Sequence, residues 1–250
     1  MNTSEAGPGK PGQSAVQKNS RDPHRNWLAN TQRISSIMST EKLNSTRILH
    51  IVGSPKADDS SSTRMAQAFL AGAQQANPGH QITTLDVWAE DLPYFGRELA
   101  LAKMIPLTGG TLSESQQAGW KEVVRVITEL DQHDKIVIST PMWNFSIPHQ
   151  LKHYFDIVVQ PGLTFGVNAA GEHIGLLKDR PVQLLLSRSS PFPERSPEDY
   201  QLPYLKHVLS FMGLKSIDTL ILEGTTLPHA EREKLINEYC AMARIAGADF

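Results

Sequence analysis

The feature that most limits how this chain folds is the alternation of short apolar runs with longer segments that repeat apolar residues at helical spacing. The apolar runs are of strand length and end at turn-forming or hydroxyl-bearing residues. The expected strands cover residues 47–53, 81–87, 135–140, 181–187 and 216–223. The expected helices cover residues 64 to about 77, 113–133, 149–159, 203–212 and 228–247. Such alternation is typical of a parallel sheet with helices on both faces.

We expect a capping box of Ser113 and Gln116 at the start of the second helix, and a stop of the fourth helix at Gly213. The expected buried stripe of the second helix consists of Val123, Val124, Ile127 and Leu130.

The order of these elements favours one arrangement of the sheet. Five strands joined through helices fit the strand order 2-1-3-4-5 of flavodoxin-like α/β folds, in which a ligand lies at the crevice between strands one and three. We therefore expect a five-stranded parallel sheet within a single domain that spans about residues 46–250. The loops after strands one and three should lie side by side at the carboxyl edge of that sheet.

Residues 1–45 differ in composition from the rest of the chain. They are rich in Ser, Asn, Gly, Pro and Gln and nearly free of aliphatic clusters, so they cannot bury enough surface to offset the entropy of ordering. We expect a disordered N-terminal extension. Because its basic residues outnumber its acidic residues by six to three, it either contacts a nucleic acid or a membrane or is simply a solvated tail.

The composition of the whole chain excludes several classes of protein. A formal net charge of −2 over 250 residues gives no general attraction to nucleic acid, and it disfavours an acidic electron carrier. Cys240 is the single cysteine, so no intrachain disulfide forms, and its helical neighbours favour a structural thiol. No apolar stretch reaches the ~18 residues of a membrane span. Since no secretory signal is recognisable either, we expect a cytoplasmic protein.

The loop after the first strand is dense in hydroxyl groups. Ser54 follows the strand, and Ser60, Ser61, Ser62 and Thr63 lead directly into the next helix. Hydroxyls and free N–H groups at a helix N-terminus bind phosphate. Neither the dinucleotide glycine fingerprint nor the Walker lysine loop is present, so the pattern predicts a site for a lone monophosphate. The alternative is that these residues only cap the helix.

The loop after the third strand is too aromatic for an ordinary solvated connection. Pro141 is followed there by Met142, Trp143, Asn144 and Phe145. A ligand of an open α/β sheet binds outside the carboxyl ends of the strands, where this loop begins. The segment either walls a flat aromatic ligand and hydrogen-bonds its edge, or only packs on the sheet.

Other patterns in the sequence are weaker indicators of a functional site. Residues 187–190 form a further hydroxyl-bearing loop at the end of the fourth strand. His149 and His153 are four residues apart on one helix, but no third ligand accompanies them, and we expect no metal. Tyr94 and Phe95 belong to a long connection, where they either line a substrate site or pack locally. We find no catalytic triad and no carboxylate pair, so we expect no catalytic side chain.

Several runs together closely resemble the bacterial FMN-dependent NADH azoreductase and quinone reductase family. These runs are residues 141–145, 150–152, 154–156 and 162–165, and the resemblance covers nearly everything from Arg47 onward. It implies a flavodoxin-like fold, bound FMN and an electron donor that is NADH in preference to NADPH. It also implies quinones and aromatic azo compounds as acceptors, and a homodimer with active sites at the subunit interface.

The resemblance assigns a role to each of the three loops. The first would hold the FMN phosphate, the second would flank the flavin ring and donate N–H groups to its edge, and the third would lie against the pyrimidine end. The expected cofactor-binding residues are Ser54, Ser60, Ser61, Ser62, Met142, Trp143, Asn144, Phe145, Ser187, Arg188, Ser189 and Ser190.

One departure from the family concerns the third loop, which usually reads Ser-Arg-Gly-Gly. Ser189 and Ser190 stand here in place of the two glycines. Either the loop keeps the family's path and accepts backbone strain, or it shifts and offers a hydroxyl to the flavin; we expect the second. Met38 lies about where members of the resembled family begin, so we expect residues 1–37 to be dispensable.

Two other functions on the same fold stay open at this point. A flavodoxin-type electron carrier would need an acidic docking surface, which the near-neutral charge disfavours. A flavin-free binding protein is the other, because the changed third loop affects contacts to the flavin.

Overall fold

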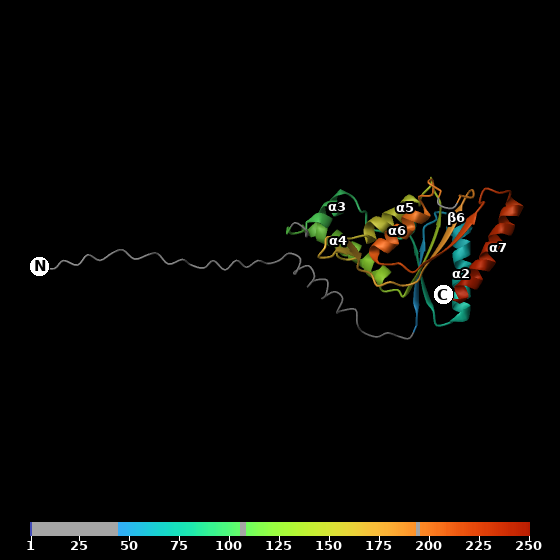
Figure 1. The fold of residues 1–250 in the computed structure, drawn as a ribbon, viewed down its shortest axis with the longest axis horizontal. Coiled ribbons are helices and arrows are strands. Elements are labelled where there is room, and N and C mark those ends of the chain that lie inside the picture. The colour runs from blue at the N-terminus through green and yellow to red at the C-terminus, as the bar shows by residue number, and fades with distance from the viewer. Residues whose placement is uncertain (2–44, 106–108, 194–195) are drawn as a thin grey trace.

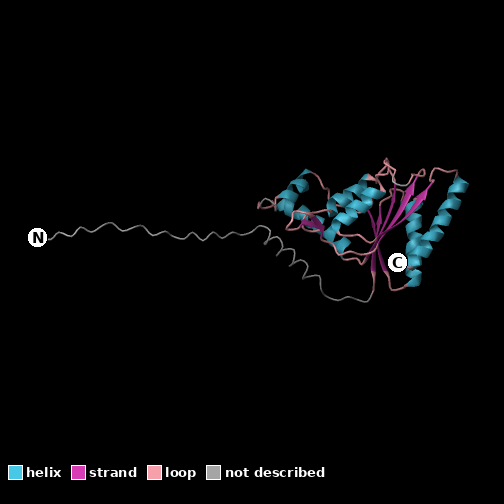
Figure 2. Cartoon of the chain, in the orientation of Figure 1, coloured by secondary structure: helices cyan, strands magenta, loops and turns pink. Residues whose placement is uncertain are grey.

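The computed structural model describes residue 1 and residues 45–105, 109–193 and 196–250. Five parallel strands form its central sheet in the order β2-β1-β3-β6-β7 (Figures 1 and 2), which confirms the predicted order 2-1-3-4-5. The strands are β1 (Arg47–Val52), β2 (Gln81–Asp86), β3 (Lys135–Pro141), β6 (Val182–Arg188) and β7 (Ile217–Glu223). The predicted N-terminal extension lies, except for its first and last residues, outside the described residues.

Helices cover both faces of the sheet, as the alternation predicts (Figure 1). One face carries α2 (Ser61–Ala76) and α7 (His229–Ala248), and the opposite face carries α4 (Glu114–Asp131), α5 (His149–Val158) and α6 (Leu202–Met212). The further short elements are η1 (Ala57–Asp59), α3 (Arg97–Met104), β4 (Phe165–Val167) and β5 (His173–Gly175). None of the helices in the described ranges is long and apolar enough to cross a bilayer.

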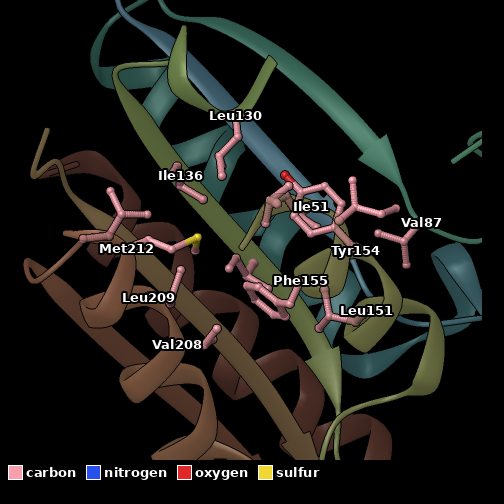
Figure 3. Packing of buried hydrophobic residues seen from close by; sticks show 14 of the residues in the cluster. Ile51, Val87, Leu130, Ile136, Leu151, Tyr154, Phe155, Val208, Leu209 and Met212 are labelled. Carbon is pink, nitrogen blue, oxygen red and sulfur yellow. The ribbon is translucent and has the colours of Figure 1, made fainter. Parts of the chain in front are cut away.

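The core lies on both sides of the central strand β3. Ile136 and Ile138 face the larger cluster of buried residues under α4, α5 and α6, whereas Val137 faces the smaller cluster under α2 and α7. Figure 3 shows Tyr154 and Phe155 of α5 packed within the larger cluster. Full burial of each large apolar side chain contributes about 1.5–3 kcal/mol, so α5 is held firmly against the sheet.

Local signals fix the ends and faces of the helices. Ser113 and Gln116 form the predicted capping box of α4, in which each side chain bonds the other residue's N–H. The buried face of α4 includes Val126, whereas the predicted Val124 is only partly buried. Successive residues of a helix point about 100° apart, so Val124 points away from Val123. Val126 is three residues from Val123 and therefore lies on the same buried face. Gly213, with φ of 110°, ends α6 as predicted.

The two irregular regions also follow the sequence closely. The long connection after β2 contains α3, which packs on α4. Within it Tyr94 is highly exposed, while Phe95 packs against the larger buried cluster. The excursion after α5 folds into β4 and β5, which pair as a small antiparallel hairpin.

Candidate functional site

Three loops meet at the carboxyl edge of the sheet and enclose a cleft of about 310 Å³. They follow β1, β3 and β6, as predicted. Seven of the twelve predicted residues line the cleft, and these are Ser54, Ser60, Ser61, Met142, Trp143, Ser187 and Ser189. The other five lie beside it, and these are Ser62, Asn144, Phe145, Arg188 and Ser190.

The loop after β1 leaves the N-terminus of α2 without a cap. Ser60 is at the N-cap position, but no side chain makes the capping bond. Its Oγ lies 3.0 Å from the Oγ of Ser62 instead. The helical hydrogen bonds begin at Arg64, whose N–H donates to the carbonyl of Ser60 over 2.9 Å, so the N–H groups ahead of it have no intrahelical acceptor. This geometry favours anion binding over the capping alternative.

A second polar group at this end of α2 is also unsatisfied. The Oγ1 of Thr63 is buried and has no hydrogen-bond partner within the described part of the chain. A buried hydroxyl without a partner costs stability, so such groups normally have a protein atom, a water or a ligand beside them. Thr63 does not line the cleft, so its unsatisfied hydroxyl is a feature of the helix start and is no evidence for a ligand.

The loop after β3 is a tight turn in a strained conformation. Trp143 and Ser146 exchange two main-chain hydrogen bonds of 2.9 Å, and the residues between them, Asn144 and Phe145, have φ of 45° and 70°. Two consecutive positive φ angles define a type I′ turn, which normally carries glycine at the second position. Holding a phenylalanine there costs on the order of 1–3 kcal/mol, and strain of this kind gathers at functional sites.

The strained turn is bonded to Tyr200 and has two backbone N–H groups without an acceptor among the described residues. The N–H of Tyr200 donates to the carbonyl of Phe145 over 3.0 Å, and the Oγ of Ser146 donates to the carbonyl of Tyr200 over 3.4 Å. The N–H groups of Asn144 and Phe145 have no acceptor among the described residues. Both residues follow the cleft-lining residue Trp143, so two unused N–H donors lie beside the cleft.

An aromatic cluster supports the turn, and sequence reasoning missed one of its members. The Nε1–H of Trp88 donates to the carbonyl of Gly53 over 3.2 Å, and its ring lies 5.9 Å from Trp143 and 5.0 Å from His149. Trp88 follows β2, whose carboxyl end lies at the same edge as that of β1. The position of β2 beside β1 in the predicted order was therefore the signal that could have found it.

The two histidines of α5 serve separate purposes. His149 contributes its ring to the aromatic cluster, whereas the Nε2 of His153 accepts the N–H of Phe95 over 3.2 Å. Within the ranges that the structure describes, no group of His, Cys, Asp and Glu could hold a metal ion. Cys240 lies in α7 away from the cleft lining, and burial raises the pKa of its thiol.

The loop after β6 differs most from its prediction. Arg188 is only 4% exposed, and its guanidinium bonds Asp199 at 2.7 Å and Gln201 at 3.1 Å and lies 3.5 Å from Glu223. Its side chain thus points into an ion-pair network and does not line the cleft. The carbonyl of Ser187 accepts the N–H of Met142 over 2.8 Å, which joins this loop to the loop after β3.

Ser189 and Ser190 do not have the backbone strain that glycine would relieve. Among the described residues other than glycine, positive φ occurs only at Ala57, Asn144 and Phe145. Both serines are exposed; Ser189 lines the cleft and its carbonyl accepts the Oγ1–H of Thr226 over 3.0 Å, whereas Ser190 does not line the cleft. Of the two outcomes considered for this loop, the strained one is therefore absent.

Sequence reasoning also missed the charged residues of the cleft. Lys56, Arg64 and Arg232 line it together with Asp59 and Glu233. Arg232 and Glu233 come from α7, far along the chain from the loop after β1. Only the packing of α7 against α2 brings them to the cleft.

Comparison with known proteins gives the family of the chain. A family model described as flavodoxin-like fold matches residues 46–244. The chain belongs to this flavodoxin-like family. A relative from Nitratidesulfovibrio vulgaris, named FMN-dependent NADH:quinone oxidoreductase, is 41% identical over 181 residues, which are 71% of this chain and 86% of the relative. FMN-dependent NADH:quinone oxidoreductase 1 of Bradyrhizobium diazoefficiens is 37% identical over 185 residues, 73% of this chain and 88% of the relative.

Solved structures agree with membership of the flavodoxin-like family. The crystal structure of an azoreductase from Bacillus anthracis superposes with a TM-score of 0.73 at 25% identity, over 82% of this chain and 100% of that chain. The superposition therefore shows that this azoreductase and the chain have a similar fold.

Proposed function

We propose that this flavodoxin-like protein is an FMN-dependent oxidoreductase that uses NADH to reduce quinones by two electrons and to cleave aromatic azo compounds to amines. The proposal depends mainly on one observation. The uncapped N-terminus of α2 and the strained turn after β3, which has unused N–H donors, lie at the same cleft. Relatives that are 37% and 41% identical bear names of the same activity.

The residues present fit the phosphate of FMN. Ser54, Ser60 and Ser61 line the cleft at the N-terminus of α2, where hydroxyls and free N–H groups are the donors that a phosphate accepts. Ser62 supports Ser60 through their shared hydrogen bond of 3.0 Å. The loops after β1 and β3 are neighbours in the sheet, and ligands of this topology bind at such a crevice, which supports the proposal.

The turn after β3 would hold the flavin ring. The N–H groups of Asn144 and Phe145 would donate to the polar edge of the ring, and Met142 and Trp143, which line the cleft, would flank it. Ser187 and the residues after it would hold the pyrimidine end. When bound, FMN takes a hydride from the nicotinamide and passes two electrons to an acceptor.

The protein's own part in this chemistry is binding and orientation. A hydride transfer between stacked rings needs no side-chain acid or nucleophile, so the absence of a predicted catalytic residue is compatible with the proposal. Trp143 and Phe145 are 39% and 51% exposed, and such exposed rings at the cleft mouth suit a planar donor or acceptor stacked over the site.

We also propose a homodimer. Tyr94, Leu101, Met104 and Phe145 expose large apolar surface on the segments after β2 and β3. Large exposed apolar side chains are the material of interaction surfaces, which supports the proposal. A monomeric mass by light scattering at micromolar concentration would contradict the dimer. For location we propose the cytoplasm, since the proposed donor NADH is abundant there.

One experiment separates the proposal from its alternatives. The purified protein is titrated with FMN, its absorbance in the flavin bands is recorded, and turnover with NADH and a quinone is then measured. Bound flavin with NADH-dependent turnover is the expected result. Bound flavin without such turnover indicates an electron carrier, and a protein that binds no flavin is a binding protein on the same fold.

A further inference from the structure

Two helices begin side by side at the cleft. Arg64 in the first turn of α2 forms an ion pair of 2.9 Å with Glu233 near the start of α7. Further along, a Cβ at Gly72 would collide with the carbonyl of Arg244, and a Cβ at Gly247 would collide with the carbonyl of Phe69. Glycine at these two positions lets the helices approach closely, as they lie in Figure 1, and this contact fixes where α7 starts relative to α2.

The start of α7 brings an uncompensated cation to the cleft. Of the three cations in the lining, Arg64 is paired with Glu233, whereas Lys56 lies on the same loop as the lining residue Asp59 and forms no ion pair with any described residue. Arg232 lines the cleft and forms no ion pair with any residue in the described ranges.

The position of Arg232 is unfavourable unless an anion is nearby. Arg232 is the fourth residue of α7, and a helix N-terminus carries partial positive charge that repels a cation in the first turn. The neighbouring helix α2 has no acidic residue in its own first turn and no cap. Glu231, also in the first turn of α7, is exposed and does not line the cleft. The positive ends of two helices and a free guanidinium therefore share one small space.

We propose that Arg232 binds the phosphate of the flavin cofactor and makes the site selective for FMN over riboflavin. The inference rests on the proposed function. The hydroxyls and N–H groups of the loop after β1 fix the position of the phosphate, and Arg232 supplies positive charge from the opposite wall. Riboflavin lacks the phosphate, so a residue that acts on the phosphate alone leaves riboflavin binding unchanged.

The test compares two ligands on three variants. FMN and riboflavin are each titrated into the wild-type protein, Arg232→Gln, Arg232→Lys and Lys234→Gln, and the dissociation constants are read from the quenching of flavin fluorescence. Lys234 is the matched control, because it lies on the same helix, carries the same charge and is exposed outside the cleft lining. Loss of a hydrogen bond to a charged group should raise the FMN dissociation constant of Arg232→Gln about tenfold to a hundredfold.

Every result of these titrations either supports or overturns the proposal. Support requires that Arg232→Gln weaken FMN and spare riboflavin, that Arg232→Lys recover part of the loss, and that Lys234→Gln bind both ligands as the wild type does. Equal weakening of FMN and riboflavin, an unchanged FMN constant, or the same loss in Lys234→Gln would overturn it. Wild-type protein that binds neither flavin overturns the proposed function as well, whereas normal FMN binding by Arg232→Gln overturns only the role of Arg232.

Discussion

Replacing Arg188 by methionine removes the cation from the middle of a buried network. The guanidinium bonds the carboxylate of Asp199 at 2.7 Å and the side-chain oxygen of Gln201 at 3.1 Å, and it lies 3.5 Å from the carboxylate of Glu223. Arg188 is 4% exposed and Asp199 12%, so water cannot replace the lost partner fully. Methionine keeps much of the length and none of the charge.

The size of the loss follows from this burial. Breaking a buried ion pair by removing one partner costs about 3–5 kcal/mol, because the other charge stays buried. Asp199 still accepts the N–H groups of Gln201 and Leu202 over 3.0 and 3.1 Å, which favours the lower end of that range. In a domain of this size about 3 kcal/mol lowers the melting temperature by roughly 6–12 °C.

The assay is thermal unfolding of the flavin-free protein, followed by circular dichroism. Arg125→Met is the matched control, because Arg125 lies near Glu122, Glu129 and Glu90 at 2.9, 3.8 and 3.9 Å but is 44% exposed. Exposed ion pairs contribute about 0–1 kcal/mol, so the control should change the melting temperature by less than about 4 °C. If Arg188→Met melts no lower than Arg125→Met, burial does not determine how much this ion-pair network contributes to stability, and the reasoning is wrong.

Three further predictions concern the cleft and the sheet beneath it. Ser60→Ala with Ser62→Ala should weaken FMN binding by well over tenfold, at about 1.5–3 kcal/mol for each hydrogen bond to a charged group, and an unchanged titration would contradict the phosphate assignment. Ser189→Gly with Ser190→Gly should leave FMN affinity unchanged or lower it, since neither serine has a positive φ, and a clear gain would refute this. Burial lowers the pKa of His50 to about 4 from 6.5. The unfolded chain therefore binds the proton first, and on the order of 3 kcal/mol of stability should be lost as the pH falls from 6.5 to 4. Urea unfolding across that range checks it, and a variant His50→Gln with the same pH dependence would show that another group is responsible.

The fold was predictable because its signals are local. Each signal depends on residues that are close in sequence. Examples are the lengths of the strands, the capping box of Ser113 and Gln116, and the end of α6 at Gly213. The sequence analysis placed Val124 on the buried face of α4 because it is apolar and adjacent to Val123. The rotation of about 100° per helical residue places Val126 on that face instead. The edge at which the loops meet followed from the strand order alone.

The parts of the site that were missed depend on contacts between distant segments. Trp88 reaches the turn after β3 only because β2 pairs with β1, and Arg232 reaches the cleft only because α7 packs on α2. The side chain of Arg188 turns away from the cleft because Asp199 and Gln201 lie behind it. No spacing in the sequence encodes these directions, and Arg188 was predicted to bind the cofactor because its loop resembles the third loop of the family.

The Arg188 network also explains how the third loop can do without its glycines. Asp199 and Gln201, which bond Arg188, flank Tyr200, and the N–H of Tyr200 holds the strained turn at Phe145. The loop is thus tied to the turn through a buried cation, and its backbone needs no left-handed residue at positions 189–190. If this is right, Arg188→Met should weaken FMN binding as well as stability, because the strain at Phe145 would relax once Tyr200 is released. A variant that is less stable but binds FMN at wild-type affinity would show that the turn holds its conformation without this support.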